Sequence, residues 1–166
     1  MRRTTVALAF VTLTACAGGE GADAPAGRPP STVTFEDQQD MSASTLWVDV
    51  ADEEGERRRG LMHVEHLPAD EGMAFVFDEP TSGGFWMKNT LIPLSVAFVG
   101  EDGSVVGVLD MEPCDADPCP SYGIDDPYVL AIEANQGWFE DNGIGVGDRA
   151  ALETSETSET SGGLYG

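Results

Sequence analysis

Basic residues are scarce in this sequence, and lysine is nearly missing. The 166 residues include 8 Lys and Arg against 30 Asp and Glu, a formal net charge of −22, and Lys88 is the single lysine. Nucleic-acid binding needs clustered basic side chains, so this composition excludes nucleic acid as a partner. Because concentrated salt screens such self-repulsion, the composition favours a halophilic source, haloarchaeal or other. An acidic secreted protein from an ordinary GC-rich organism is the alternative.

Long apolar runs are also missing. The run Val6–Leu13 is too short to cross a bilayer stably, and it follows Arg2 and Arg3, so residues 1–15 are predicted to be a signal peptide. The stretch from Leu13 to Cys16 resembles a lipobox, the lipidation site of bacterial and archaeal lipoproteins. We therefore expect lipid on Cys16 and an exported protein anchored to the outer face of the cytoplasmic membrane. The alternative is an ordinary signal peptide in which Cys16 is incidental.

Two further segments lack the apolar residues needed for a core. Residues 16–31 consist largely of Ala, Gly, Pro and acidic residues and predict a flexible tether. Residues 154–166 continue a Glu-Thr-Ser repeat and predict a disordered acidic tail. Residues 32–153 remain, which is the length of one ordinary domain.

Within this domain, short apolar segments alternate with turn residues. Alternation and turn chemistry predict strands over 44–52, 72–80 and 127–135, a hairpin over 94–111 that turns at Glu101–Gly103, and a closing strand before 152. Short helices are expected after residue 53 and near 136–141. The predicted fold is α+β and mainly β: a compact antiparallel, partly closed barrel with two short peripheral helices.

Four segments together carry a family resemblance. They are "RRRGLM", "GMAFVF", "FWMKNTLIPLSVAFV" and "AIEANQGWFEDNGIGVGDR". In this order, between about Thr45 and Ala150, they resemble the DUF192 family, also called UPF0127. The resemblance implies a compact β-rich fold and frequent export, but no known biochemical activity. Family members usually have Asp after Pro-Leu, where this chain has Ser95, so no role for that carboxylate is transferred.

Cys114 and Cys119 lie in a proline-rich loop. In an exported protein, two such cysteines are expected to form a disulfide. A redox-active dithiol is the alternative. It is disfavoured because four residues separate the cysteines and no neighbouring base would lower a thiol pKa.

Lys88 follows Trp86 in a predicted strand, so both side chains point to the same side. A tryptophan face beside an ammonium group suits an anionic or sugar-like ligand. We predict a cleft lined by Trp86, Lys88 and Glu133, with Arg57 at its edge and Glu133 paired with the lysine. In the alternative, Trp86 belongs to the core and Lys88 is a salt-bridged strand residue.

A soft-metal site is a weaker hypothesis. Met62, His63, His66 and Met87 combine the ligand types that bind Cu(I). Methionines in apolar segments usually fill the core, so we expect no metal here.

Motifs for nucleotide binding or a nucleophilic serine are missing, and no cofactor is expected. The sequence thus favours a lipid-anchored, non-enzymatic domain that binds a small ligand or an envelope protein. The alternative is an enzyme acting on envelope material with Lys88, Glu133 and Asp148 as its polar groups.

Overall fold

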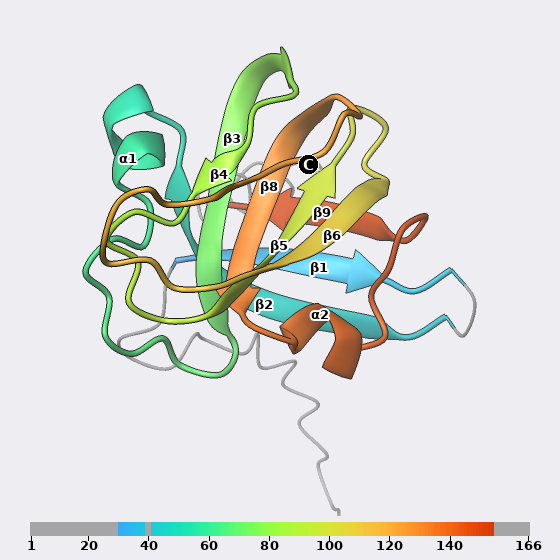
Figure 1. Ribbon diagram of the computed structural model, residues 1–166. Helices are drawn as coiled ribbons and strands as arrows, with labels where there is room; N and C mark the ends of the chain where they lie inside the picture. Colours follow the sequence, from blue (N-terminus) through green and yellow to red (C-terminus); the bar gives the residue numbers. More distant parts are fainter. Residues whose placement is uncertain (1–29, 39–40, 155–166) are drawn as a thin grey trace, which may run out of the picture.

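The computed structural model describes residues 30–38 and 41–154 and confirms a mainly β fold with two short helices (Figure 1). The predicted signal peptide, most of the tether, Cys16 and most of the tail lie outside these residues. The elements in chain order are β1 (Ser31–Glu36), β2 (Ala43–Ala51), α1 (Glu54–Arg59), β3 (Glu71–Thr81), β4 (Phe85–Trp86), β5 (Leu94–Val99), β6 (Val105–Met111), β7 (Ser121–Tyr122), β8 (Tyr128–Asn135), α2 (Trp138–Asp141) and β9 (Arg149–Glu153).

Seven strands form one sheet in the order β6-β5-β8-β3-β2-β1-β9. Five of its neighbouring pairs are antiparallel, as predicted. The pair β2–β3 is parallel, which the prediction of an antiparallel barrel did not include. A parallel pair needs a crossover. Here α1 and the loop over residues 60–70 return the chain from the end of β2 to the start of β3.

The sheet curls until its two edges approach each other. Ser104, just before β6, forms a bridge with Arg149 at the start of β9. The N–H of Ala150 donates to the carbonyl of Gly103 at 2.9 Å, and that of Val105 donates to the carbonyl of Asp148 at 2.8 Å. Because these bonds join the edges at one end only, the barrel is partly closed, as predicted.

One hydrophobic core lies inside the curl. It contains alternate residues of the strands, such as Val33, Leu46 and Ile132. From α2, Trp138 and Phe139 pack against Phe35, with ring centroids 5.7 and 5.5 Å from it. The short helix therefore closes the open part of the curl with aromatic side chains.

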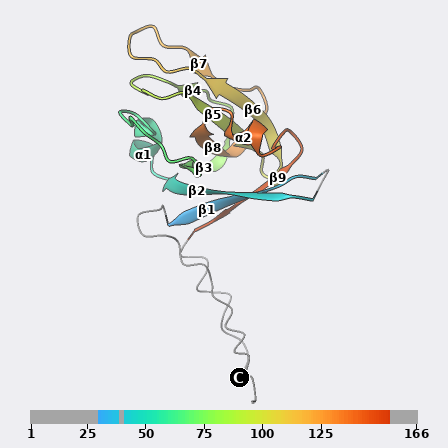
Figure 2. The same ribbon diagram turned by 90° about the horizontal axis from the view of Figure 1, so that it is seen from below.

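A second hydrophobic core covers the other face of β3, β5 and β8. It includes Phe75, Val96 and Phe98 from these strands and Met87 from the segment after β4. The two-stranded sheet β4–β7 lies over this face, away from β1, β2 and β9 (Figure 2). This outer layer, together with α1, forms the surroundings of the pocket described below.

β1 was not identified from the sequence, although Val33 and Phe35 alternate with polar residues and are fully buried. It begins at Ser31, the last residue of the predicted tether. In the part of the chain that the structure covers, neither helix has the length and apolar character needed to span a membrane.

Candidate ligand-binding pocket

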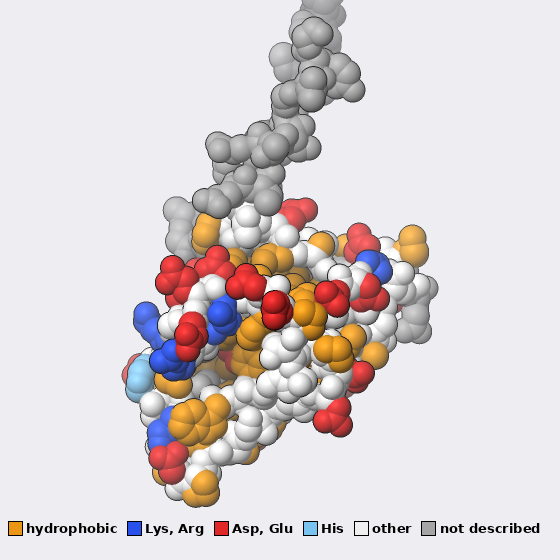
Figure 3. All heavy atoms as spheres, turned by 90° about the horizontal axis from the view of Figure 1, so that it is seen from above, with side chains coloured by type: hydrophobic (Ala, Val, Ile, Leu, Met, Phe, Trp, Pro, Cys, Tyr) orange, Lys and Arg blue, Asp and Glu red, His pale blue; other side chains and the backbone are white. Residues whose placement is uncertain are grey.

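A pocket of about 340 Å³ opens between α1, the outer layer and the face of the main sheet. Its size falls within the roughly 300–1,000 Å³ of small-molecule sites. Figure 3 shows Lys and Arg side chains grouped beside a hollow that contains hydrophobic side chains. The lining comes from α1 and the turn after it (Glu54, Arg57–Arg59, Gly60–Met62), β3 (Phe75, Phe77, Thr81), the segment 83–90 (Gly83, Gly84, Phe85, Trp86, Thr90) and β8 (Tyr128, Glu133).

Glu133 is the buried acid of this pocket. It lies in the middle of β8, opposite Met73 of β3 and Val96 of β5, and it is only 5% exposed. No hydrogen bond or ion pair to its carboxyl group occurs among the described residues. Burial raises the pKa of Glu133 to about 8, because the charged form loses its hydration. The side chain is therefore largely protonated at neutral pH.

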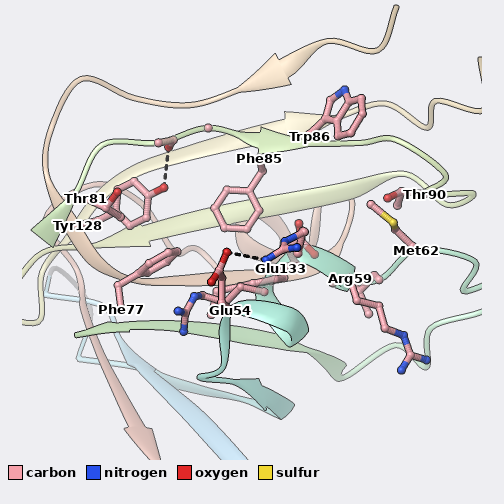
Figure 4. Close-up of a pocket in the computed structure, with 17 residues that line it drawn as sticks. Glu54, Arg59, Met62, Phe77, Thr81, Phe85, Trp86, Thr90, Tyr128 and Glu133 are labelled. Carbon is pink, nitrogen blue, oxygen red and sulfur yellow. Dashed lines mark hydrogen bonds and ion pairs between the residues drawn. The ribbon is translucent and has the colours of Figure 1, made fainter. Parts of the chain in front are cut away.

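Aromatic rings form the apolar walls. Phe85 of β4 meets Phe75 of β3 edge to face, with centroids 4.9 Å apart. Phe77 and Tyr128 form a similar pair at 5.5 Å. The Tyr128 hydroxyl donates to the carbonyl of Gly83 at 2.6 Å, which ties the turn before β4 to β8. In Figure 4, Phe85 points into the pocket, whereas Trp86 points away from it.

Arginines from α1 form the rim. Arg57 is the most constrained: its guanidinium lies over the Phe77 ring at 5.3 Å and donates to the carbonyl oxygens of Val76, at 2.9 Å, and Asp52. Arg58 pairs with Glu54 at 2.5 Å on the exposed surface. Arg59 is exposed and makes no ion pair within the described residues. The rim is thus positive in a strongly acidic protein.

Three of the four predicted site residues border this pocket, namely Trp86, Glu133 and Arg57, although the Trp86 ring points away from it. The predicted pairing of Glu133 with Lys88 is wrong. Lys88 is not part of the lining; it pairs with Asp117. β4 ends at Trp86, and the following segment bridges to Cys114. The lysine is thereby turned toward the loop of Asp117.

Trp86 and Lys88 lie on the same side, as strand alternation predicted. Trp86 is 54% exposed, and the Lys88 ammonium lies 5.9 Å from the centroid of its ring. The alternative in which Trp86 belongs to the core is therefore wrong. Its other half, a salt-bridged Lys88, is correct, because the ammonium pairs with Asp117.

The predicted disulfide between Cys114 and Cys119 is present. Its loop holds the outer layer in place. The N–H of Asn89 donates to the carbonyl of Cys114 at 2.9 Å, and β7, just after the disulfide, pairs with β4. The disulfide therefore supports the wall that carries Phe85.

The residues of the enzyme alternative do not meet in one site. Of Lys88, Glu133 and Asp148, only Glu133 lines the pocket. The carboxylate of Asp148 accepts hydrogen bonds from the backbone N–H of Gln38, at 3.0 Å, and of Gly145, at 2.8 Å. Asp148 thus joins the loop before β9 to the turn after β1.

The residues of the metal alternative are also separated. Met62 lines the pocket, Met87 is buried in the outer core, and His66 lines a different hollow. α1 ends at Arg59, so positions 62 and 66 do not share a helix face, as that hypothesis assumed. In the described residues, no cluster of three or more His, Cys, Asp or Glu side chains is arranged to bind a metal.

Several solved structures are similar to this chain, and two of them are as follows. A protein from Sinorhizobium meliloti 1021, described as a candidate transcription regulator, shares 26% identity with a TM-score of 0.68, over 80% of this chain and 98% of that one. A protein of unknown function from Novosphingobium aromaticivorans DSM 12444 shares 29% identity with a TM-score of 0.65, over 72% and 83% of the chains. No curated protein matches the sequence.

The family model of DUF192, described as "Uncharacterized ACR", matches residues 35–152. The chain belongs to the DUF192 family. The match covers β2 to α2 completely, the last two residues of β1, all of β9 except its last residue, and all residues of the pocket. The resemblance seen in the sequence is thereby confirmed for the whole region from about Thr45 to Ala150.

Ser95, where this DUF192 chain departs from the expected Asp, has a structural role. Its hydroxyl donates to Asp110 of β6 at 2.5 Å and accepts from the N–H of Gly137 at 2.9 Å. Ser95 is buried and thus links β5 and β6 to the start of α2. It does not line the pocket of Glu133.

Most of the aromatic wall was missed by the site prediction: Phe75, Phe77, Phe85 and Tyr128 were not proposed as site residues. Alternation in "GMAFVF" places Phe75 and Phe77 on one side, and this signal was available. Alternation alone does not predict that α1 and the outer layer leave a pocket on that side of β3.

Proposed function

We propose that this DUF192 protein is a lipoprotein-type member from a halophilic source, a non-enzymatic extracytoplasmic domain that binds a small amphipathic organic anion. The observation that supports the ligand class is the combination of aromatic walls with an arginine rim. Ligand sites of this size are mostly apolar, with a few polar groups that fix the ligand. The aromatic rings would hold an apolar body, and the guanidinium groups would hold a carboxylate or sulfonate.

The charge distribution supports an anion over a cation. The described basic residues are Arg57, Arg58, Arg59, Lys88 and Arg149. Arg57, Arg58 and Arg59 line the pocket, whereas Lys88 pairs with Asp117 outside the lining and Arg149 lies at the start of β9. Glu133, the buried acid, is uncharged at neutral pH and does not repel an anion. The acidic composition gives no support to nucleic-acid binding, although the similar protein from Sinorhizobium meliloti is described as a candidate transcription regulator.

Binding is predicted to depend on the rim charge. We expect 4-isopropylbenzoate, an aromatic carboxylate, to bind the protein at pH 6.5, and Arg59→Glu to weaken this binding about tenfold or more. An about tenfold loss corresponds to 1.4 kcal/mol, the scale of one charge-assisted contact. Isothermal titration calorimetry at a fixed salt concentration measures both affinities.

Arg149→Glu is the matched control. It makes the same change in net charge, but Arg149 lies at the start of β9 and does not line the pocket. We expect its affinity to stay close to that of the unmodified protein. Equal losses in both variants would mean that only overall charge matters, and no binding to either protein would reject the proposed function.

The membrane location is predicted to depend on Cys16. Cys16→Ser removes the thiol that would accept lipid, so the protein is expected to leave the membrane fraction or to keep its signal peptide. Fractionation and intact-mass measurement in the source organism test this. An unchanged mass and an unchanged membrane fraction for the variant would reject lipidation.

A further inference from the structure

The carboxyl group of Glu133 differs from that of Asp148, another buried acid. Asp148 is 4% exposed, and its carboxylate accepts two backbone N–H groups. Glu133 is similarly buried, but its carboxyl group has no partner among the described residues. Among the described residues no fully buried side-chain oxygen or nitrogen lacks a hydrogen bond, so the Glu133 carboxyl group must be accessible from the pocket. Glu133 also lines the pocket, so a bound molecule can supply the missing partner.

The surroundings of Glu133 keep its proton in place. The charged groups that line the pocket are Glu54, Arg57, Arg58 and Arg59, all from α1, and none of them forms an ion pair with Glu133. Its neighbours across the ladder, Met73 of β3 and Val96 of β5, are apolar. The lining residues of the outer layer and of β8 carry no charge other than its own. Burial is the only cause of its raised pKa.

We propose that the Glu133 carboxyl group donates a hydrogen bond to the ligand, and that the ligand is an organic anion whose apolar body ends in an acceptor oxygen such as a carbonyl. This inference rests on the proposed function and names the ligand class of the same site. The anionic end contacts the arginine rim, the body lies between the aromatic rings, and the carbonyl reaches Glu133. No proton is transferred, because the carboxylic acid only shares its O–H hydrogen.

A carboxylic acid that donates a hydrogen bond discriminates between ligands of similar size by whether they carry an acceptor oxygen. A site built to hydrogen-bond its ligand rejects an analogue that lacks the acceptor, because the buried protein group then stays unpaired. A ligand with a cationic inner end would require an ionised Glu133 instead, so its affinity would increase as pH rises through about 8. The two ligand classes therefore have opposite pH dependences.

Two benzoates test the proposal. 4-Acetylbenzoate carries a ketone opposite its carboxylate, and 4-isopropylbenzoate has a similar size and branching but no acceptor oxygen. At pH 6.5 we expect the acetyl compound to bind about tenfold more tightly, the scale of one hydrogen bond to an otherwise unsatisfied group. At pH 9.5 Glu133 is ionised and cannot donate, so the preference should disappear. Titration calorimetry at constant salt measures the four affinities.

Two variants show whether Glu133 is the donor. Glu133→Leu should abolish the preference for 4-acetylbenzoate at both pH values. Glu133→Gln has an amide N–H₂ that donates at every pH, so the preference should persist at pH 9.5. Infrared difference spectra of the unmodified protein and Glu133→Gln add a readout without ligand: a carboxylic-acid carbonyl band at pH 6.5 that is lost at pH 9.5.

The outcomes separate this inference from the proposed function. If neither benzoate binds, the proposed function fails. If both bind with equal affinity at pH 6.5, the anion site stands and the donor role of Glu133 is overturned. Tighter binding of 4-amidinobenzoate, whose amidinium group stays charged at both pH values, at pH 9.5 than at pH 6.5 would also overturn it, since that result identifies Glu133 as a counter-ion.

Discussion

Replacing Glu133 by glutamine is expected to stabilise the folded protein at pH 8 and above by about 4 kcal/mol. The pKa of Glu133 rises from an ordinary 4.5 to about 8 on folding, because the carboxyl group is buried without a partner. Above pH 8 the folded protein must keep a buried, unpaired carboxylate, whereas the unfolded chain hydrates it. Glutamine has nearly the same shape and no charge, so the variant avoids this loss.

The pH dependence has a defined sign. Between pH 4.5 and about 8 the folded state of the unmodified protein binds more protons at Glu133 than the unfolded state does. Its free energy of unfolding therefore falls as pH rises through this window. The advantage of Glu133→Gln should be small near pH 4.5, grow up to about pH 8, and then stay constant. Urea unfolding at intervals of pH and constant salt measures it.

Glu101→Gln is the matched control. Glu101 is exposed in the turn between β5 and β6, so the same chemical change at that position should leave stability within about 0.5 kcal/mol at every pH. A Glu133→Gln advantage that does not change between pH 5 and pH 9 would contradict the raised pKa. Lower stability of the variant at pH 9 would show that the carboxylate has a partner in solution.

Gly72→Ala is expected to destabilise the protein by about 3 kcal/mol or more. Gly72 lies in β3 opposite Ala134 of β8. A Cβ atom at this position would lie 2.2 Å from the carbonyl oxygen of Glu133 and 2.9 Å from Leu46 Cδ2. The first of these is a backbone atom of a central strand, so it cannot move aside without disturbing the ladder. Overpacking of this kind typically costs about 1–3 kcal/mol, and more where backbone must shift.

Gly55→Ala is the companion substitution. Gly55 lies in α1, and a Cβ there would meet nothing within 4 Å. Alanine favours the helix over glycine by about 1 kcal/mol, so this variant should be slightly more stable. Thermal unfolding of both variants under the same salt conditions separates the clash from a general effect of removing glycine. Similar melting temperatures for the two variants would contradict the close approach at Gly72.

Local signals in the sequence were sufficient for much of this fold. The hairpin over 94–111 follows from two apolar runs around a turn at Glu101–Gly103, and the structure places β5 and β6 there. Alternation was enough to place Trp86 and Lys88 on the same side. These features depend on neighbours a few residues apart, and their physical cause is the fixed geometry of the strand.

Contacts between distant segments decided the rest. β2 and β3 are parallel because α1 and the loop after it return the chain to the start of β2, and residue alternation is the same for either direction. Lys88 pairs with Asp117 because β4 pairs with β7 and the Cys114–Cys119 loop bridges to residues 88 and 90.

The state of Glu133 is the clearest case of this division. The sequence by itself placed an acidic residue at position 133 in a predicted strand. It also established that the chain is acidic and has few basic residues. Only the tertiary structure decided that three strands and an aromatic wall bury this carboxyl group while the arginines of α1 stay beyond ion-pair distance. Whether a side chain is buried or paired depends on residues that are far apart in the chain, so no local sequence pattern predicts it.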